Sequence, residues 1–236
     1  MMDENSEEYV VIRGRRYFVH SNELDLTGNT NFNISEIEGL ENLKNLESLY
    51  LRGNALKKIE NLDHLTSLKN LDLSFNNITE ITGLVNLKNL ESLSFGDSID
   101  ESNLIEEIKG LDTLTNLRYL YLARNEIAEI KGLENLKNLE ILLLSSNKIT
   151  EIKGLDNLRN LKQLYLSSNR IKEIKGLNKL KNLELLNLDC NVLTEIKGLE
   201  NLKNLRELSL HGNPIEKVRG INSLSQLKIL GVDNFK

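Results

Sequence analysis

The strongest constraint on this chain is that it repeats itself every 22 residues. Residues 129–150 (EIKGLENLKNLEILLLSSNKIT) align without a gap with residues 151–172 (EIKGLDNLRNLKQLYLSSNRIK). Asparagines recur at the same interval, at Asn125, Asn147, Asn169, Asn191 and Asn213, and again at Asn54 and Asn76. A fixed period of this length indicates a solenoid, in which each unit forms one coil and buries its apolar side only by stacking on neighbouring coils.

Each unit follows the pattern LxxLxLxxNxIxxIxGLxxLxx, which gives a structural role to most positions. The central LxL, as in residues 164–166, predicts a short strand whose leucines turn inward while the middle residue turns outward. The asparagine sits where the chain leaves the strand, and its amide can satisfy backbone groups of the turn. Gly176 permits a tight bend. The leucines of residues 177–183 recur every third residue, which suits a short 3₁₀-like or single-turn helical segment on the outer side.

Applied along the chain, this pattern predicts ten parallel rungs, and the inner sheet should be about 45 Å long at about 4.8 Å per rung. Residues 1–22 are expected to form an N-terminal tail and cap, and residues 23–236 the solenoid. Two insertions interrupt the register, near residues 30–33 and 98–102. The rung centres are Asp25, Tyr50, Asp72, Ser94, Tyr121, Leu143, Tyr165, Asn187, Ser209 and Gly231.

The two ends of the predicted solenoid differ. Residues 9–12 are apolar or aromatic, as are residues 16–19 apart from Arg16, and the two runs flank a turn that contains Gly14, so we expect a β-hairpin laid over the first rung. At the other end, residues 227–232 begin a further unit, and an exposed last strand there can pair with another molecule. An alternative role for the hairpin is an anion-binding tip made of Arg13, Arg15 and Arg16, but a charged turn needs no ligand, so we favour the cap.

The repeated motif resembles the short leucine-rich repeat shared by the nuclear regulator of type 1 protein phosphatase and by bacterial internalins. The resemblance covers residues 21–234. It implies an α/β repeat solenoid, a right-handed leucine-rich-repeat horseshoe with the parallel sheet inside, whose members mostly bind proteins through that inner surface. The KGL turn is closer to the phosphatase regulator, because internalins usually carry proline there and are exported.

Variation between the units is concentrated at the outward strand positions, whereas outer segments such as KGLENLKNLE and KGLDNLRNLK are nearly interchangeable. Rungs five to eight bring together aromatic and aliphatic residues that we expect to face water. An exposed apolar patch usually marks a binding site, and tyrosine is enriched at interface hot spots. Cross-strand pairing is the alternative, but we favour binding because the leucine core already stabilises the sheet. The predicted partner-binding residues are Tyr50, Asp72, Tyr119, Tyr121, Ile141, Leu143, Tyr165, Leu185, Asn187 and Asp189.

Charge also differs between the faces of the predicted solenoid. The strand-flanking positions of the inner face hold seven acids, no lysine, and only Arg52 and Arg124 as bases. We therefore expect a protein partner with an apolar centre and a basic rim, because complementary charge steers association. A net charge of −5 argues against non-specific nucleic-acid binding. The acids are Glu23, Asp25, Asp72, Asp97, Asp189, Glu207 and Asp233.

The sequence favours a binding protein over an enzyme, and we expect no catalytic residue, cofactor or metal. His20, His64 and His211 are far apart in the predicted solenoid, and none joins Cys190 and an acid in a nucleophilic set. His211 and Asp189 fall on neighbouring rungs, where a surface pair is expected. There is no glycine-rich phosphate loop, CxxC or HExxH motif.

The acidic segment at residues 96–108 is open to two interpretations. Clustered carboxylates suit calcium, but their spacing does not match the twelve-residue calcium loop, so we favour a solvated acidic loop that projects toward a partner. The acids are Asp97, Asp100, Glu101, Glu106 and Glu107.

The lone Cys190 and the lack of a signal-peptide stretch or membrane span favour a cytoplasmic location, with the nucleus as the alternative. We expect a monomer that contacts no membrane. The leading hypothesis is a protein-binding module resembling the phosphatase regulator. The alternatives are an activator of a small GTPase and a structural spacer that assembles through its last rung.

Overall fold

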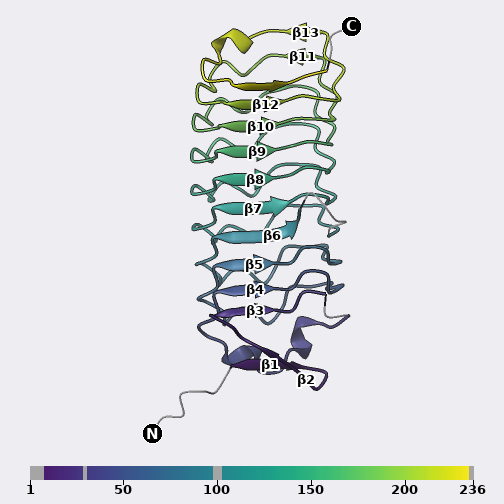
Figure 1. The fold of residues 1–236 in the computed structure, drawn as a ribbon, viewed down its shortest axis with the longest axis vertical. Helices are drawn as coiled ribbons and strands as arrows, with labels where there is room; N and C mark the ends of the chain where they lie inside the picture. The colour runs from purple at the N-terminus through teal and green to yellow at the C-terminus, as the bar shows by residue number, and fades with distance from the viewer. Residues whose placement is uncertain (1–7, 29–30, 98–102, 234–236) are drawn as a thin grey trace.

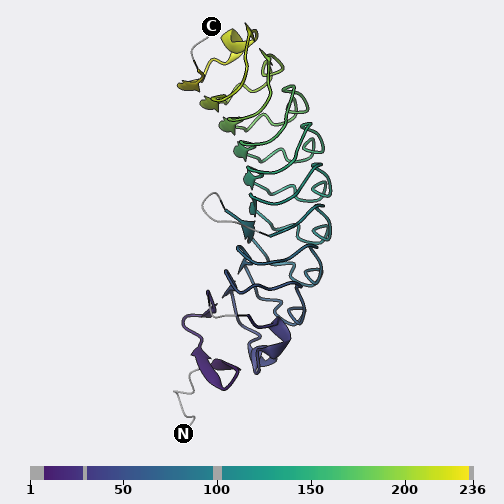
Figure 2. The same ribbon diagram turned by 90° about the vertical axis from the view of Figure 1, so that its right-hand side faces the viewer.

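The computed structural model describes residues 8–28, 31–97 and 103–233 as a solenoid of stacked coils (Figure 1). One ten-stranded sheet runs along it in the order β14-β12-β10-β9-β8-β7-β6-β5-β4-β3, and all its pairings are parallel. The stack curves so that the strands line its inner side (Figure 2). The strands are β3 Glu23–Asp25, β4 Ser48–Tyr50, β5 Asn70–Asp72, β6 Ser92–Gly96, β7 Tyr119–Leu122, β8 Ile141–Leu143, β9 Gln163–Tyr165, β10 Leu185–Asn187, β12 Glu207–Ser209 and β14 Ile229–Gly231.

The register of the sheet confirms the predicted rungs. Tyr121 is paired with Leu143, and Leu143 in turn with Tyr165, and the other seven rung centres follow the same alignment. In every rung except the last, the leucines on either side of the centre point inward, as Leu164 and Leu166 do, and Phe95 replaces one of them on β6. They belong to one core that runs from the cap to the last coils. Burying one such side chain contributes about 1.5–3 kcal/mol, so the stacked leucines stabilise the fold.

The outer segments contain less helix than the spacing of their leucines suggested. The described residues form three 3₁₀ helices, η1 Ile34–Glu36, η2 Leu40–Asn42 and η3 Ile221–Ser223, and η2 and η3 lie in the first and last outer segments. In the described coils between them, separate turns close instead: the N–H of Leu180 donates to the carbonyl of Leu177 at 3.0 Å, and Leu183 does the same to Leu180 at 3.1 Å. The predicted 3₁₀-like bonds therefore form, but mostly without joining into a helix.

The repeated asparagines hold neighbouring coils together. The amide of Asn147 donates to the carbonyl of Leu144 in its own coil (3.1 Å) and to that of Leu122 in the preceding coil (2.9 Å). Its Oδ1 accepts the N–H of Ile127 at 3.0 Å. The predicted role in the turn is confirmed, and the bonds across the coil boundary add to it, because each asparagine satisfies buried backbone groups of two coils.

One member of this ladder was missed from the sequence. Asn103 occupies the asparagine position of the coil that carries the insertion, where it donates to the carbonyls of Leu73 and Phe95, both at 2.8 Å. It stands 22 residues before Asn125, so the period alone identifies it. The insertion predicted near residues 98–102 lies outside the described residues, and the one near residues 30–33 is described from residue 31.

The bend of each unit requires glycine for two reasons. Gly176 has a φ of +72°, a left-handed conformation that a side chain disfavours. In addition, a Cβ at this position would lie 2.4 Å from the carbonyl oxygen of Ile152 in the preceding coil. The predicted tight bend is therefore also a close contact between coils.

The predicted N-terminal hairpin is present as β1 Tyr9–Ile12 and β2 Arg15–Phe18. Its second strand begins one residue earlier than predicted, because a two-residue turn at Arg13 and Gly14, both with positive φ, joins the strands. Val10 and Ile12 belong to the leucine core, so the hairpin covers the first coil as a cap should. Arg13 forms an ion pair with Glu36 at 3.1 Å. The charge of Arg13 is therefore matched by an acid within the protein.

The C-terminal end is open in the described residues. A second, two-stranded parallel sheet joins β11 Glu195–Ile196 to β13 Lys217–Val218 near this end. The inward residue of the last rung, Leu230, is 40% exposed, whereas Leu208 on the preceding rung is 0% exposed. The predicted boundary between the cap and the solenoid at residues 22 and 23 stays a prediction.

Candidate interaction surface on the concave face

All ten predicted partner-binding residues except Asp189 lie within strands of the inner sheet, and Asp189 follows β10 by two residues. The strands are so short that each presents one or two outward positions, on either side of an inward leucine. Pairing in register places Tyr121, Leu143, Tyr165 and Asn187 in one row, and a second row aligns Tyr119, Ile141, Gln163 and Leu185. Strands β7 to β10 therefore collect the predicted apolar centre, which we call the concave patch: Tyr119, Tyr121, Ile141, Leu143, Tyr165 and Leu185.

The expectation that all six side chains face water is wrong for Leu143, which is only 8% exposed. It lies on the middle strand between the larger side chains of Tyr121 and Tyr165, with which it is in register, and it does not belong to the leucine core. The other five side chains are half-buried. The concave patch thus consists of one buried leucine and five half-buried aromatic and aliphatic side chains.

Two tyrosines of the concave patch have perturbed titration behaviour. Burial raises the pKa of Tyr121 above its ordinary value, and the neighbouring Tyr119 and Tyr165 raise it further. Burial also raises the pKa of Tyr165, with a smaller effect from the charge of Glu207. The Tyr165 hydroxyl donates to Gln163 Oε1 at 3.0 Å. Both hydroxyls therefore stay protonated at neutral pH and remain suited to hydrogen bonding with a partner.

Toward the N-terminal end, the concave patch continues into a polar hollow of about 310 Å³ that reaches from Tyr121 to Tyr50 and Asp72. The Asp72 carboxylate accepts the N–H of Ser74 at 2.8 Å. In the same hollow, Arg52 forms an ion pair of 2.7 Å with Asp97. The charge of Asp97 is therefore already matched within the protein, and Asp72 is the acid that faces the hollow without an ion pair among the described residues.

Toward the C-terminal end of the inner face, Asp189 and Asp233 form hydrogen bonds and an ion pair with residues of the last rungs. Asp189 Oδ1 accepts the Ser209 hydroxyl at 2.6 Å and the backbone N–H of His211 at 2.7 Å. The predicted closeness of His211 and Asp189 is thus confirmed through the backbone, but the imidazole ring pairs with Asp233 at 3.0 Å instead. Hydrogen bonds from Gly212 and His211 hold the pKa of Asp233 below its ordinary value.

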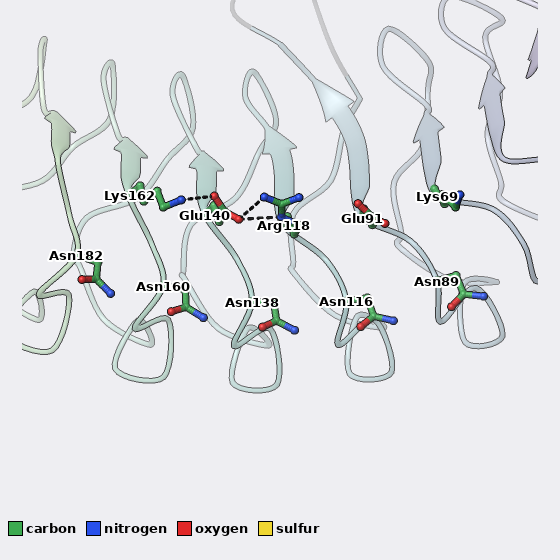
Figure 3. A pocket seen from close by; sticks show the side chains of 10 residues that line it. All are labelled: Lys69, Asn89, Glu91, Asn116, Arg118, Asn138, Glu140, Asn160, Lys162 and Asn182. Carbon is green, nitrogen blue, oxygen red and sulfur yellow. Dashed lines mark hydrogen bonds and ion pairs between the residues drawn. The ribbon is translucent and has the colours of Figure 1, made fainter.

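Charged residues that directly precede the strands alternate in sign from one strand to the next, a pattern that was missed from the sequence. Lys69 pairs with Glu47 at 2.8 Å, and Arg206 with Glu184 at 3.4 Å. In the middle of the column, Glu140 accepts from both Arg118 and Lys162 at 2.6 Å (Figure 3). The signal was available, because these positions lie two residues before the first strand leucine of each unit. The charge column is Glu47, Lys69, Glu91, Arg118, Glu140, Lys162, Glu184 and Arg206.

A hollow of about 520 Å³ follows this charge column and a parallel row of asparagines (Figure 3). The two donors hold the pKa of Glu140 below its ordinary value, with the larger effect from Lys162. Because the column is largely neutralised by its own pairs, it forms a polar rim beside the concave patch and attracts no single sign of charge.

The acids of residues 96–108 do not gather in the part of the chain that is described. Glu107 pairs with Lys131 at 2.7 Å, and Asp97 with Arg52, while Asp100 and Glu101 lie outside the described residues. No group of three or more histidine, cysteine, aspartate and glutamate side chains is placed to hold a metal ion within the ranges 8–28, 31–97 and 103–233. In the same ranges there is no helix with the length and apolar character needed to span a membrane.

The stacked coils and the open inner sheet define a repeat protein of the parallel-strand solenoid class. The chain belongs to the leucine-rich repeat family, because the family model described as Leucine Rich repeats (2 copies) matches residues 66–113, 115–157 and 159–201, more than half of the chain. No curated protein sequence matches it.

Several solved structures share the fold. Internalin C2 from Listeria monocytogenes str. 4b F2365 is 27% identical, with a TM-score of 0.68, and the match covers 90% of this chain and 80% of the internalin chain. TLR13 in complex with ssRNA13 is 30% identical, with a TM-score of 0.70, over 80% of this chain and 29% of the receptor chain. A third similar structure is the ectodomain of the Arabidopsis thaliana membrane receptor kinase GASSHO1/SCHENGEN3, in complex with CASPARIAN STRIP INTEGRITY FACTOR 2. It is 27% identical, with a TM-score of 0.69, and the match covers 88% of this chain and 26% of the receptor chain.

Proposed function

We propose that this protein is a protein-binding module whose partner docks on the concave patch across β7 to β10. One observation carries the proposal: five half-buried aromatic and aliphatic side chains lie with Leu143 on β7 to β10, on the face of the sheet opposite the leucine core. The core already stabilises each rung, so the fold does not require these outer groups. Tyrosine offers a large contact area at low entropic cost, and a contiguous apolar patch of this kind is characteristic of binding sites.

The similar structures support a binding role, since two of them are complexes in which the similar chain binds another molecule, in one case an RNA and in the other CASPARIAN STRIP INTEGRITY FACTOR 2. For this chain, charge favours a protein over an RNA. Asp72, Asp189 and Glu207 flank the concave patch, and a polyanion would be repelled by them. The partner then has an apolar centre, which meets the concave patch, and basic residues toward both ends.

We extend the proposal to an adaptor resembling the nuclear regulator of type 1 protein phosphatase, acting as a monomer in the cytoplasm or nucleus without a catalytic role. The KGL form of the bend, as at Lys153 and Gly154, supports this narrower proposal. Titration with the purified catalytic subunit of a type 1 phosphatase tests it separately. Saturable binding that weakens when the concave patch is altered supports the adaptor role, and absence of binding refutes it.

The general proposal is tested by replacing Tyr121 and Tyr165 together with alanine. Partners captured from a native cell extract on immobilised protein should be lost or fall at least about tenfold, because hot-spot tyrosines each contribute more than about 1 kcal/mol. Thermal unfolding should change little, since cross-strand pairs contribute about 0.2–1 kcal/mol each.

A matched control replaces two exposed apolar side chains away from the concave patch, Val85 and Leu104, with alanine. This variant should retain the captured partners. Unchanged capture by the tyrosine variant, or a large loss of its stability, would assign these tyrosines to packing of the sheet instead of to binding.

A further inference from the structure

Many lysines and arginines on the edges of the coils form an ion pair with an acid. In the charge column, Lys162 lies 2.6 Å from Glu140. In a second column, close to the bends, Lys153 lies 2.7 Å from Glu129 and Lys131 lies 2.7 Å from Glu107. Such pairing offsets the repulsion that like charges on adjacent strands or coils produce.

A column of basic residues on the outer segments lacks such ion pairs. Each of its residues directly follows the middle leucine of its outer segment, and all are exposed. Asn182 donates to the backbone carbonyl of Arg159 and Asn204 to that of Lys181, both at 2.9 Å, so neighbouring positions are held one coil apart, about 4.8 Å. The outer basic column is Lys137, Arg159, Lys181 and Lys203.

Within the described ranges, none of these four cations forms an ion pair. Lys203 donates to the backbone carbonyl of Ser223 at 3.2 Å. Acids do occur three residues earlier, at Glu134, Asp156 and Glu200, but they flank the column without pairing to it. Like charges stacked at this spacing are destabilising, so the fold gains nothing from the arrangement itself.

Among the outer segments that carry this column, residues 177–183 have the strongest positive charge. At the position where neighbouring coils carry Glu134, Asp156 or Glu200 it has Asn178, and it adds Lys179 at the next position. Arg159, Lys179 and Lys181 line a surface hollow of about 420 Å³ together with Asn182. Three basic side chains and one amide side chain therefore line a single depression, and no acid belongs to its lining.

We propose that this hollow and the outer basic column bind a short acidic segment of a partner protein. The guanidinium of Arg159 suits paired hydrogen bonds to a carboxylate, while the two ammonium groups neutralise neighbouring acids. The flanking Asp156 and Glu200 leave only a narrow positive track, which fits one extended acidic strand. A wide polyanion such as a nucleic acid or an anionic membrane would also meet those acids and a chain of net charge −5, and would be repelled.

The probe is a fluorescein-labelled peptide of eight glutamates, titrated with the full chain and followed by fluorescence anisotropy at low and physiological salt. The double variant Arg159→Glu/Lys181→Glu should bind at least about tenfold more weakly, because it converts attraction into repulsion. The control Lys57→Glu/Lys58→Glu makes the same change of net charge at exposed lysines elsewhere and should stay within about twofold of the unaltered protein. Circular dichroism verifies that both variants are folded.

Equal weakening in both double variants would overturn the proposal, because it would reveal only a response to net charge. Absence of peptide binding by the unaltered protein would overturn it too. A uridine oligonucleotide and phosphatidylserine vesicles are titrated in parallel. If either binds more tightly than the peptide and depends on Arg159 and Lys181, the acidic-segment assignment is wrong and the hollow serves phosphate groups.

Discussion

The wall of each coil, by which we mean its inward leucines, its repeated asparagine and its glycine bend, is built from the same 22-residue unit as the concave patch. The two are nevertheless under different constraints. In the wall, Leu144, Asn147 and Gly154 have near-identical environments from coil to coil, because each must match its neighbour. On β7 to β10, the residues between the inward leucines vary freely in size and polarity. The comparison teaches that stability and recognition occupy separate positions of one repeat. Changes in the wall should therefore alter folding, and changes in the concave patch should alter binding.

The largest expected effect separates two adjacent leucines of one rung. Leu144 points into the core and is 0% exposed, whereas Leu143 lies in the concave patch. We expect Leu144→Ala to lower the free energy of unfolding by about 2–5 kcal/mol, as for other core leucines. Leu143→Ala should lower it by only about 1–2 kcal/mol, because neighbouring side chains and water can fill the space that the truncation leaves at the surface, so that no closed cavity forms. Urea denaturation of both variants measures the difference, and equal losses would erase the distinction between wall and patch.

A second comparison uses two asparagines that both bridge coils. Replacing Asn147 with alanine leaves buried carbonyls of Leu122 and Leu144 and the N–H of Ile127 without their partner. We expect a loss of about 2–3 kcal/mol, because unsatisfied buried groups cost about 1–3 kcal/mol. Asn138 makes one exposed bond, to the carbonyl of Thr115, so Asn138→Ala should lose less than about 1 kcal/mol. Thermal unfolding measures both losses. Equal losses in the two variants would show that the buried asparagines stabilise the fold no more than the exposed ones do.

The smallest expected effect concerns the charge column. Because Lys162 and Arg118 lower the pKa of Glu140, its carboxylate stabilises the folded state above the unfolded-state pKa of about 4.3. That contribution is lost as pH falls through the lower folded-state pKa. Glu140→Gln should therefore be less stable than the unaltered protein at neutral pH, by less than about 1 kcal/mol, and the two should converge in acid. A difference that persisted below the folded-state pKa would exclude the ion pairs as its cause.

The repeat made the architecture predictable, because stacking coils of equal length forces equivalent residues into register. Ten rung centres, the asparagine ladder and the glycine bend all followed from this. Its limits are local. Period alone does not report how far Tyr121 and Tyr165 cover Leu143, nor that the hairpin turn needs only two residues, since these depend on the heights of side chains and on backbone torsions. Asn103 and the charge column could also have been predicted from the sequence, by comparing the same repeat position in one coil and the next.

The composition of the concave patch was likewise predictable, because outward strand positions can be read from the repeat. The repeat does not predict which of the side chains at those positions already have a partner within the protein. Asp97 pairs with Arg52, and Asp189 accepts from Ser209 and His211. Such pairs depend on side-chain reach between rungs, which no periodicity encodes. The acids available to a partner are therefore fewer than a count of the inner face suggests.

The division between wall and patch is tested most directly by measuring, on the same samples, the affinity for a captured partner and the free energy of unfolding of Tyr121→Ala/Tyr165→Ala. We predict an affinity at least about tenfold lower, about 1.4 kcal/mol or more, with unfolding changed by no more than about 2 kcal/mol. Full affinity in a variant that has lost several kcal/mol of stability would contradict this account.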